Sequence, residues 1–301
     1  MRAYAPGIYP RSEALVQATR DLDRGRAGPD VVDAQFQADL EALVEAQQEA
    51  GLDLLSDGML RWQDLFRPLV EAADGLGPGP LTRFLDTNSF YRAPQASSAT
   101  PTLRRPLDER FLARVPGPRV ATLPSPTALA RGTGLTPVAL ATGVLKPQLA
   151  ALDADLVVLV DPFLASDDEP DLALLSDALE ALAGGPPLAL QLTFGNARRL
   201  FERGLDDLAV EGIGIDFYAT HMTDVPKGFP KLLLAGVTDA RSSALEDPET
   251  VAAFVRRLSG EREVERIDLV PNGDLQFVPE TIAREKLAKL GQARFAFVGD
   301  R

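Results

Sequence analysis

The sequence predicts an α/β protein folded as one (β/α)8 TIM barrel. Eight short apolar segments recur along the chain, helical patterns lie between them, and several helices are bracketed by start and stop residues. Near-continuous apolar strands separated by helices are typical of a parallel sheet buried on both faces. Because such barrels commonly form one domain of about 250 residues or more, we expect residues 1–301 to be a single domain. The expected strands cover residues 3–9, 52–57, 119–123, 155–161, 187–193, 211–217, 231–237 and 265–271.

The segment 29–51 shows how the helices are predicted. Pro29 stands just inside its start and Gly51 just after its end, with apolar residues at helical spacing between them. The apolar run that follows ends in Asp57, so we expect a buried strand that presents a polar side chain at its C-terminal end. Comparable signals predict helices at residues 12–25, 170–184, 196–204, 248–260 and 279–291.

The stretch 75–118 interrupts this alternation, because it is rich in proline and contains a polar run at 95–102. We expect it to be a long excursion over the mouth of the barrel, possibly with a hairpin, and not a separate domain. Long ordered loops on barrels are usually functional, although a proline-rich excursion can also be a simple cap. Both interpretations stay open from the sequence.

Composition excludes several classes of function. The formal net charge of −13 disfavours nucleic acid and anionic membranes as partners. The absence of cysteine excludes disulfides and thiolate metal sites. No apolar stretch approaches the ~18 residues of a membrane span, and no basic segment followed by an apolar run opens the chain. We therefore expect a cytoplasmic protein whose partner is a small molecule, possibly as a homo-oligomer.

Several motifs, in chain order, carry a resemblance to one family. They are Gly7 to Arg11, 48–58 followed by Arg61 and Asp64, 86–92, Pro126-Thr127, Asp161-Pro162, 194–196, 236–242, and Pro271 with Leu275. Together they resemble the catalytic barrel of cobalamin-independent methionine synthase over nearly the whole chain. The family's non-catalytic half has no counterpart here, which would make this a core-only version.

The resemblance implies a substrate site at the C-terminal strand ends. In that family a histidine, two cysteines and a glutamate hold zinc, which binds homocysteine as a thiolate that takes a methyl group from a reduced folate. The corresponding positions here carry Gln191, Thr193, Asp216 and, approximately, Gly273. A neutral amide, a hydroxyl and one carboxylate do not replace imidazole and two thiolates for zinc. We therefore expect no zinc and no other bound metal or cofactor, with a reduced folate as a possible substrate.

Further family positions point the same way. Two acidic residues that hold homocysteine in the family correspond to Met59 and, approximately, Val160 here, so the amino-acid grip is also expected to be lost. Carboxylates at Asp161, Asp216, Asp239 and Asp274 offer oxygen ligands to a hard cation such as magnesium, although their spacing does not demand one.

The candidate catalytic residues are Asp216, at the end of an expected strand, and His221 in the loop after it. A carboxylate beside an imidazole is a plausible acid–base pair, whereas a lone histidine is more often a hydrogen-bonding loop residue. The arginines suit an anionic metabolite or internal ion pairs, and Tyr91 suits a flat ligand or simple packing. The candidate substrate-binding residues are Arg11, Asp57, Arg61, Tyr91, Asp161, Gln191, Thr193, Asp239, Arg241 and Asn272.

These observations favour a diverged, zinc-less relative of the family that binds a small anionic metabolite, possibly in folate-linked methyl transfer. Two alternatives remain. One is a non-catalytic ligand-binding or regulatory barrel, which explains the lost zinc ligands simply. The other is a metal-free lyase resembling uroporphyrinogen decarboxylase, although the motifs lie closer to the synthase.

Overall fold

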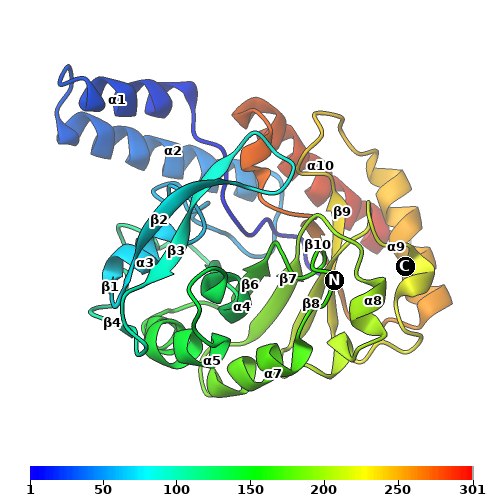
Figure 1. Cartoon of the computed structure of the whole chain (residues 1–301). Coiled ribbons are helices and arrows are strands. Elements are labelled where there is room, and N and C mark those ends of the chain that lie inside the picture. The colour runs from blue at the N-terminus through cyan, green and yellow to red at the C-terminus, as the bar shows by residue number, and fades with distance from the viewer. Residues whose placement is uncertain (300–301) are drawn as a thin grey trace.

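The computed structural model describes residues 1–299, and its centre is a curled, six-stranded parallel sheet (Figure 1). The strands lie in the order β10-β9-β8-β7-β6-β5, so each strand pairs with its neighbour in sequence. Every residue in these six strands is buried, as expected of a parallel sheet covered on both faces. The strands are β5 (Val120–Pro124), β6 (Leu156–Asp161), β7 (Leu188–Leu192), β8 (Gly212–Asp216), β9 (Leu232–Thr238) and β10 (Ile267–Pro271).

The other two expected strands, at 3–9 and 52–57, are each reduced to one isolated bridge. Ala3 pairs in parallel with Leu269 of β10, and Leu55 pairs in parallel with Arg119 just before β5. The sequence therefore predicts the six strands of the sheet correctly. The backbone pairing gives a six-stranded sheet with two isolated bridges, and not the eight-stranded sheet expected.

Side chains explain why these two segments do not extend into ladders. The amide of Ser56 donates to Oε1 of Gln47 at 2.9 Å, and Nε2 of Gln47 donates back to the Ser56 carbonyl at 2.9 Å. The amide of Gly7 likewise donates to the Thr122 hydroxyl at 2.9 Å. Because a backbone group bonded to a side chain is not free to pair with the next strand, the pairing stops after a single bridge.

Helices surround the sheet, and the capping signals define their starts. Ser12 caps α1 by accepting from the amide of Leu15, and α2 begins at Pro29 as the sequence predicts. Helices α1 and α2 form an antiparallel pair that extends from one side of the molecule (Figure 1). The helices are α1 (Glu13–Asp23), α2 (Pro29–Glu49), α3 (Arg67–Ala72), α4 (Pro126–Ala130), α5 (Pro137–Leu140), α6 (Lys146–Ala150), α7 (Leu172–Ala181), α8 (Arg198–Phe201), α9 (Pro248–Arg262) and α10 (Glu280–Gly299), with a π-helical turn at η1 (Ala141–Leu145) and 3-10 turns at η2 (Leu205–Asp207), η3 (Met222–Asp224) and η4 (Leu275–Phe277). No helix within residues 1–299 is long and apolar enough to cross a membrane.

The excursion at 75–118 contains an antiparallel hairpin of β2 (Leu76–Arg83) and β3 (Phe90–Ala96). A second, two-residue pairing joins β1 (Ala73–Asp74) to β4 (Thr102–Leu103). In Figure 1 the hairpin lies beside the sheet, to the left of its strands. Its connecting turn contacts residues that follow β6, β9 and β10, so the excursion lies over the C-terminal ends of the strands.

Two helices differ in length from the prediction. Helix α8 spans only Arg198–Phe201, although 196–204 was expected to be helical. Helix α10 continues to Gly299, so Gly291 lies inside it and does not end it. A Cβ added at Gly291 would lie 1.8 Å from the carbonyl oxygen of Ala50. The glycine therefore serves the close approach of α10 to the end of α2.

This contact generates a stability prediction. We expect Gly291→Ala to lower the free energy of unfolding by about 1–3 kcal/mol, because the added methyl must displace backbone. Gly260→Ala in α9 is the matched control, since a Cβ there meets nothing within 4 Å. The control should be stabilising by about 0.5–1 kcal/mol, as alanine favours helix. Urea unfolding followed by circular dichroism measures both, and equal shifts would refute the packing explanation.

Candidate functional site

Polar side chains gather at the C-terminal ends of the parallel strands, where enzymes of this architecture place their chemistry. The group combines candidates from β6, β7, β8 and the residue after β10. All five side chains are at least 97% buried, so each must be paired or must serve a ligand. They are Asp161, Gln191, Thr193, Asp216 and Asn272.

Asp216 has one carboxylate oxygen that accepts no hydrogen bond from residues 1–299. Its Oδ1 accepts from Nδ2 of Asn272 at 3.1 Å and from the amide of Tyr218 at 2.9 Å. Its Oδ2 is buried and has no hydrogen-bond partner among the described residues. Burial raises the pKa of the Asp216 carboxyl, against the bonds from Asn272 and Tyr218 and the nearby charge of Arg241, which lower it. A carboxyl in this state is suited to exchange a proton or to receive a donor.

Thr193 lies beside Asp216 on the neighbouring strand. Gln191 of β7 is in register with Gly214 of β8, so the positions two residues further on are also neighbours on the same face. The Thr193 hydroxyl is buried and likewise has no partner in the part of the chain that the structure describes. Two buried oxygens at the ends of neighbouring strands are therefore left without hydrogen bonds, to each other or to other groups of residues 1–299.

Asp161 and Gln191 are already occupied within the fold. Each carboxylate oxygen of Asp161 accepts two hydrogen bonds. Oδ2 accepts from the hydroxyls of Ser125 and Thr127, and Oδ1 accepts from the amides of Phe163 and Leu164. Gln191 donates to the carbonyl of Pro271 at 2.8 Å. Their contacts tie strands and loops together, which is a structural role.

Aromatic rings cover the strand ends. Phe194, directly after Thr193, has a φ of 55°. A Cβ added at Gly273 would lie 2.4 Å from the Phe194 ring, so the ring fills the space that a side chain would take there. The ring also contacts Phe277, with centroids 5.5 Å apart. The guanidinium of Arg241 lies over the Phe194 ring, 4.4 Å from its centroid.

The hairpin between β2 and β3 completes this cover. Phe84 stacks on Phe277 at 5.7 Å between centroids and contacts Tyr91 and Phe163 at 6.1 and 6.2 Å. The carboxylate of Asp86 pairs with Arg241 at 3.0 Å. The hollow beneath the hairpin, lined by Phe84, Tyr91, Phe277 and others, has a volume of about 20 Å³. That is room for a single water molecule.

His221 makes its hydrogen bonds away from the open oxygens, whereas the charge of Asp239 is near enough to raise the pKa of Asp216. Nδ1 of His221 pairs with the Thr223 hydroxyl at 2.7 Å on an exposed loop, where it caps a short 3-10 turn. The carboxylate of Asp239 accepts from the amide of Arg241 at 3.0 Å. The hydrogen bonds of His221 and of Asp216 do not join the two side chains, so the structure gives no support for their pairing.

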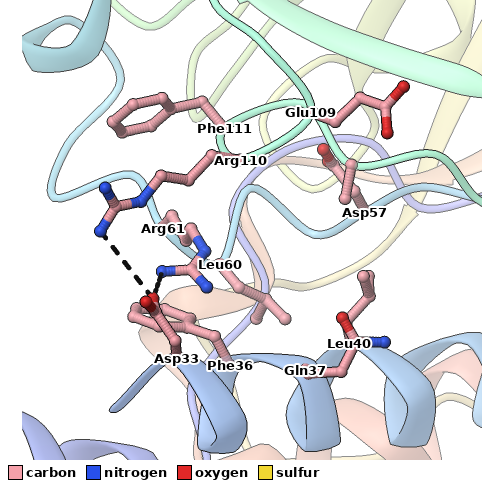
Figure 2. Close-up of a pocket in the computed structure, with 11 residues that line it drawn as sticks. Asp33, Phe36, Gln37, Leu40, Asp57, Leu60, Arg61, Glu109, Arg110 and Phe111 are labelled. Atoms are coloured by element: carbon pink, nitrogen blue, oxygen red, sulfur yellow. Dashed lines mark hydrogen bonds and ion pairs between the residues drawn. The ribbon is translucent and has the colours of Figure 1, made fainter. Parts of the chain in front are cut away.

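The remaining candidates lie on the rim near α2. Arg11 donates to the carbonyls of Leu60 at 2.7 Å and Trp62 at 2.9 Å, which fixes the loop between them. Arg61 pairs with a carboxylate of α2, and Asp57 lies across a cleft from that pair (Figure 2). Tyr91 belongs to the aromatic cover described above and packs on Phe66 at 5.4 Å between centroids.

Sequence analysis missed a buried ion pair beneath the site. Lys286 of α10 is fully buried and donates to Glu246 at 3.0 Å and to the Ala244 carbonyl. Glu246 also accepts from the Tyr218 hydroxyl at 3.1 Å and from the amide of Asp239 at 2.9 Å. The network therefore anchors the loop after β9, which carries Arg241. A lysine among the other charged residues of this helix gives no local signal of such burial.

Comparison with known proteins gives these positions a context. No protein-family profile matches the chain. A 5-methyltetrahydropteroyltriglutamate–homocysteine methyltransferase from Synechococcus sp. is 28% identical over 318 residues, covering 90% of this chain and 41% of that protein. The enzyme of the same name from Mycobacterium leprae is 26% identical over 219 residues, covering 65% of this chain and 29% of that protein. The chain thus spans less than half the length of these relatives.

Solved structures agree on the fold. A B12-independent methionine synthase from Shewanella sp. W3-18-1, in complex with selenomethionine, superposes with a TM-score of 0.73 and 17% identity, covering 91% of each chain. A putative vitamin-B12-independent methionine synthase from Listeria monocytogenes gives 0.72 and 16% identity, covering 98% of this chain and 97% of that one. This chain resembles cobalamin-independent methionine synthases.

The zinc positions implied by that resemblance do not form a zinc site. Gln191, Thr193 and Asp216 supply an amide, a hydroxyl and one carboxylate, and the space at Gly273 is filled by the ring of Phe194. This donor set lacks the nitrogen and sulfur ligands that zinc prefers. Among residues 1–299, no group of three or more His, Asp or Glu side chains is placed to hold a metal ion.

Asp274, near the covered hollow, generates a pH prediction. Burial raises the pKa of this carboxyl from 3.8 to about 6, against the bonds from the Ile8 amide and from Gln276, which lower it. The folded state therefore keeps the proton to a higher pH than the unfolded state. The stability from this difference is fully present below pH 3.8 and is lost as the pH rises through about 6.

Asp274→Asn removes the ionisation while keeping an acceptor for Ile8. We expect the variant to be more stable than the wild type at pH 7, by up to about 3 kcal/mol, with the difference vanishing near pH 4. Asp247→Asn is the control of opposite sign, because bonds from Thr250 lower the pKa of the Asp247 carboxyl. The stabilising effect of the wild-type Asp247 carboxylate is present above the unfolded pKa and is lost as the pH falls. Urea unfolding across this range measures both, and a pH-independent difference for Asp274→Asn would contradict the assignment.

Proposed function

We propose that this chain is a diverged, zinc-free relative of cobalamin-independent methionine synthases that binds a small anionic metabolite at the C-terminal ends of β7 to β10. The observation that carries the proposal is the pair of buried, unpartnered oxygens on Thr193 and Asp216. Leaving a buried polar group without a partner costs about 1–3 kcal/mol. A ligand that donates hydrogen bonds to both atoms recovers this energy, and zinc plays no part in it.

The charges above this pair suggest the ligand class. Arg241 is close enough to lower the pKa of Asp216, and its exposed partner Asp86 can be exchanged for another anion. A reduced folate combines a ring with amino and N–H donors, which suit Asp216 and Thr193, and a carboxylated tail, which suits a guanidinium. It is therefore the first substrate class to test, and methyl transfer is the corresponding chemistry.

Entry of such a ligand requires the aromatic cover to move. Both open oxygens are buried, and the hollow of about 20 Å³ under Phe84 does not reach them, so Phe84 and the hairpin turn must swing away from Phe277 to admit a ligand. The Asp86–Arg241 pair is exposed, and such pairs contribute only about 0–1 kcal/mol. The hairpin turn is thus held to the rim weakly enough for a ligand to displace it.

We also infer that the strands close into an eight-fold ring. The amide of Asp53 donates to the carbonyl of Ala3 at 2.9 Å, which links the two bridged segments to each other. Together with the bridges to β10 and β5, this bond supports a closed barrel with two very short strands.

A second candidate function is a non-catalytic ligand-binding or regulatory barrel. The specific observation in its favour is that the exposed His221 side chain pairs with Thr223, so Asp216 has no imidazole beside it among its recorded contacts. Binding at Thr193 and Asp216 is common to both candidates. Turnover of a bound folate with a thiol acceptor separates them.

Metal analysis provides one prediction. We expect purified protein to hold far less than one zinc per chain, because the donor atoms at Gln191, Thr193 and Asp216 do not suit that ion. Elemental mass spectrometry on protein purified without chelator measures it, and dialysis against zinc followed by gel filtration tests acquired binding. One zinc per chain that survives gel filtration would reverse the proposal.

A ligand screen provides the next prediction. Tetrahydrofolate at about a hundred times its dissociation constant should raise the stability of the native state by about 2.7 kcal/mol. Asp216→Asn and Arg241→Ala should each weaken binding by about tenfold or more, equal to about 1.4 kcal/mol. Isothermal titration and thermal shift measure these effects.

Arg199→Ala is the matched control, since this arginine of α8 is exposed and is not one of the residues of the proposed site. It should bind tetrahydrofolate as the wild type does. A pterin without the glutamate tail should lose the dependence on Arg241 and keep the dependence on Asp216. Folate binding that is unaffected by either site variant would place the ligand elsewhere and refute the site.

A further inference from the structure

A second cleft lies apart from the strand-end site, between α2 and the segment 109–113 (Figure 2). We name it the α2 cleft. Its volume is about 400 Å³, which falls within the range of small-molecule sites. Phe36 and Leu40 of α2, with Leu60 and Phe111, give it apolar surfaces, and charged groups stand at its two ends.

Asp57 forms one end of the cleft and has an open acceptor. The residue is only 6% exposed, and its Oδ1 accepts from the amide of Met59 at 3.1 Å. Its Oδ2 has no hydrogen-bond partner among residues 1–299. The nearest recorded cation, Arg119, stays 3.9 Å from that oxygen, which is beyond hydrogen-bonding distance. Glu109 stands on the same side in Figure 2 and adds a second carboxylate, although it is exposed and pairs with Arg114.

The arginines at the other end are already committed. Arg61 pairs with Asp33 at 2.6 Å and lies 4.2 Å above the ring of Phe36. Arg110 points toward the same carboxylate at 3.8 Å (Figure 2). These contacts hold both guanidinium groups against α2, so among the groups that line the cleft the open acceptor is on Asp57. Its carboxyl also feels the Ala113 amide and the charge of Arg119, whose buried Nε and Nη2 likewise have no hydrogen-bond partner among residues 1–299.

We propose that the α2 cleft binds a small organic cation, with an amine or guanidine head on a short apolar stem. The head donates to Oδ2 of Asp57, and the stem lies on Leu60, Phe36 and Phe111. A charge-assisted bond to a buried carboxylate is among the strongest that a small head group makes. The net charge of −13 adds long-range attraction for a cation and repels an anion.

The competing explanation is a water molecule. Atoms 3.9 Å apart, such as Oδ2 of Asp57 and the Arg119 guanidinium, can share one bridging water. In that case the carboxylate is satisfied within the protein and offers nothing to a ligand. The two explanations predict opposite results for binding of a cationic probe to the wild type.

The test uses three probes of one shape. Phenethylamine carries a cationic head, 2-phenylethanol a neutral one and 3-phenylpropanoate an anionic one on the same aromatic body. Binding to the full chain is followed by NMR titration or calorimetry. We expect phenethylamine to bind one per chain and at least about tenfold more tightly than either of the others. Failure of phenethylamine to bind, or equal binding of all three, overturns the proposal.

Variants locate the site. Asp57→Asn should remove the charge preference, so that phenethylamine binds no better than 2-phenylethanol. Gln37→Trp should fill the cleft from the exposed face of α2 and abolish binding without touching Asp57. Gln48→Trp is the matched control on the same helix, exposed and outside the cleft, and should bind as the wild type does. Binding that survives Gln37→Trp overturns the location even if Asp57→Asn fails to fold.

The proposal is independent of the function assigned to the strand-end site. A folate titration in the presence of saturating phenethylamine separates them, because two sites give independent isotherms. Competition between the two ligands would show that the probe binds at the strand ends and would overturn the α2 cleft assignment.

Discussion

The packing of the Phe194 ring against the bare backbone of Gly273 determines the form of the strand-end site. A side chain at position 273 would collide with the ring at 2.4 Å, so the two residues are mutually dependent. Phe194 holds a φ of 55°, an unusual conformation for a residue with a large side chain. Arg241 lies on the outer face of the ring, and Asp86 of the hairpin turn pairs with Arg241. The cover over Thr193 and Asp216 is therefore built outward from one ring.

The sequence predicts the six central strands closely because each is buried on both faces and is a continuous apolar run. The segments at 3–9 and 52–57 are less continuous, with Pro6 and Gly7 in one and Asp53 and Ser56 in the other, and each forms only one bridge. The cause lies in side chains such as Gln47 and Thr122, which take up backbone groups from elsewhere in the chain. Local periodicity does not contain that information. The length of α10 could not be predicted for a similar reason, since Gly291 lets α10 pack closely against Ala50 at the end of α2.

For the site, sequence reasoning succeeds where the fold alone places a residue. Residues at strand ends meet because parallel strands end at one edge, and this brings Thr193, Asp216 and Asn272 together. It fails where contacts depend on loops. The Asp86–Arg241 pair joins residues 155 positions apart, and the sequence around either residue does not predict that they meet. The contacts of Arg11 and Arg61 with carbonyls of the rim and a carboxylate of α2 could not be predicted for the same reason.

The two proposed sites differ in what their free groups accept. At the strand ends an unpartnered carboxylate oxygen lies beneath an arginine whose only recorded ion-pair partner is exposed, so donor and acceptor capacity are both available. In the α2 cleft the arginines are held by Asp33, and the available capacity is the acceptor on Asp57. Composition is similar in both places, with carboxylates, guanidinium groups and aromatic rings. Ligand preference therefore follows from which charges are already paired within the fold and not from which residue types line the site.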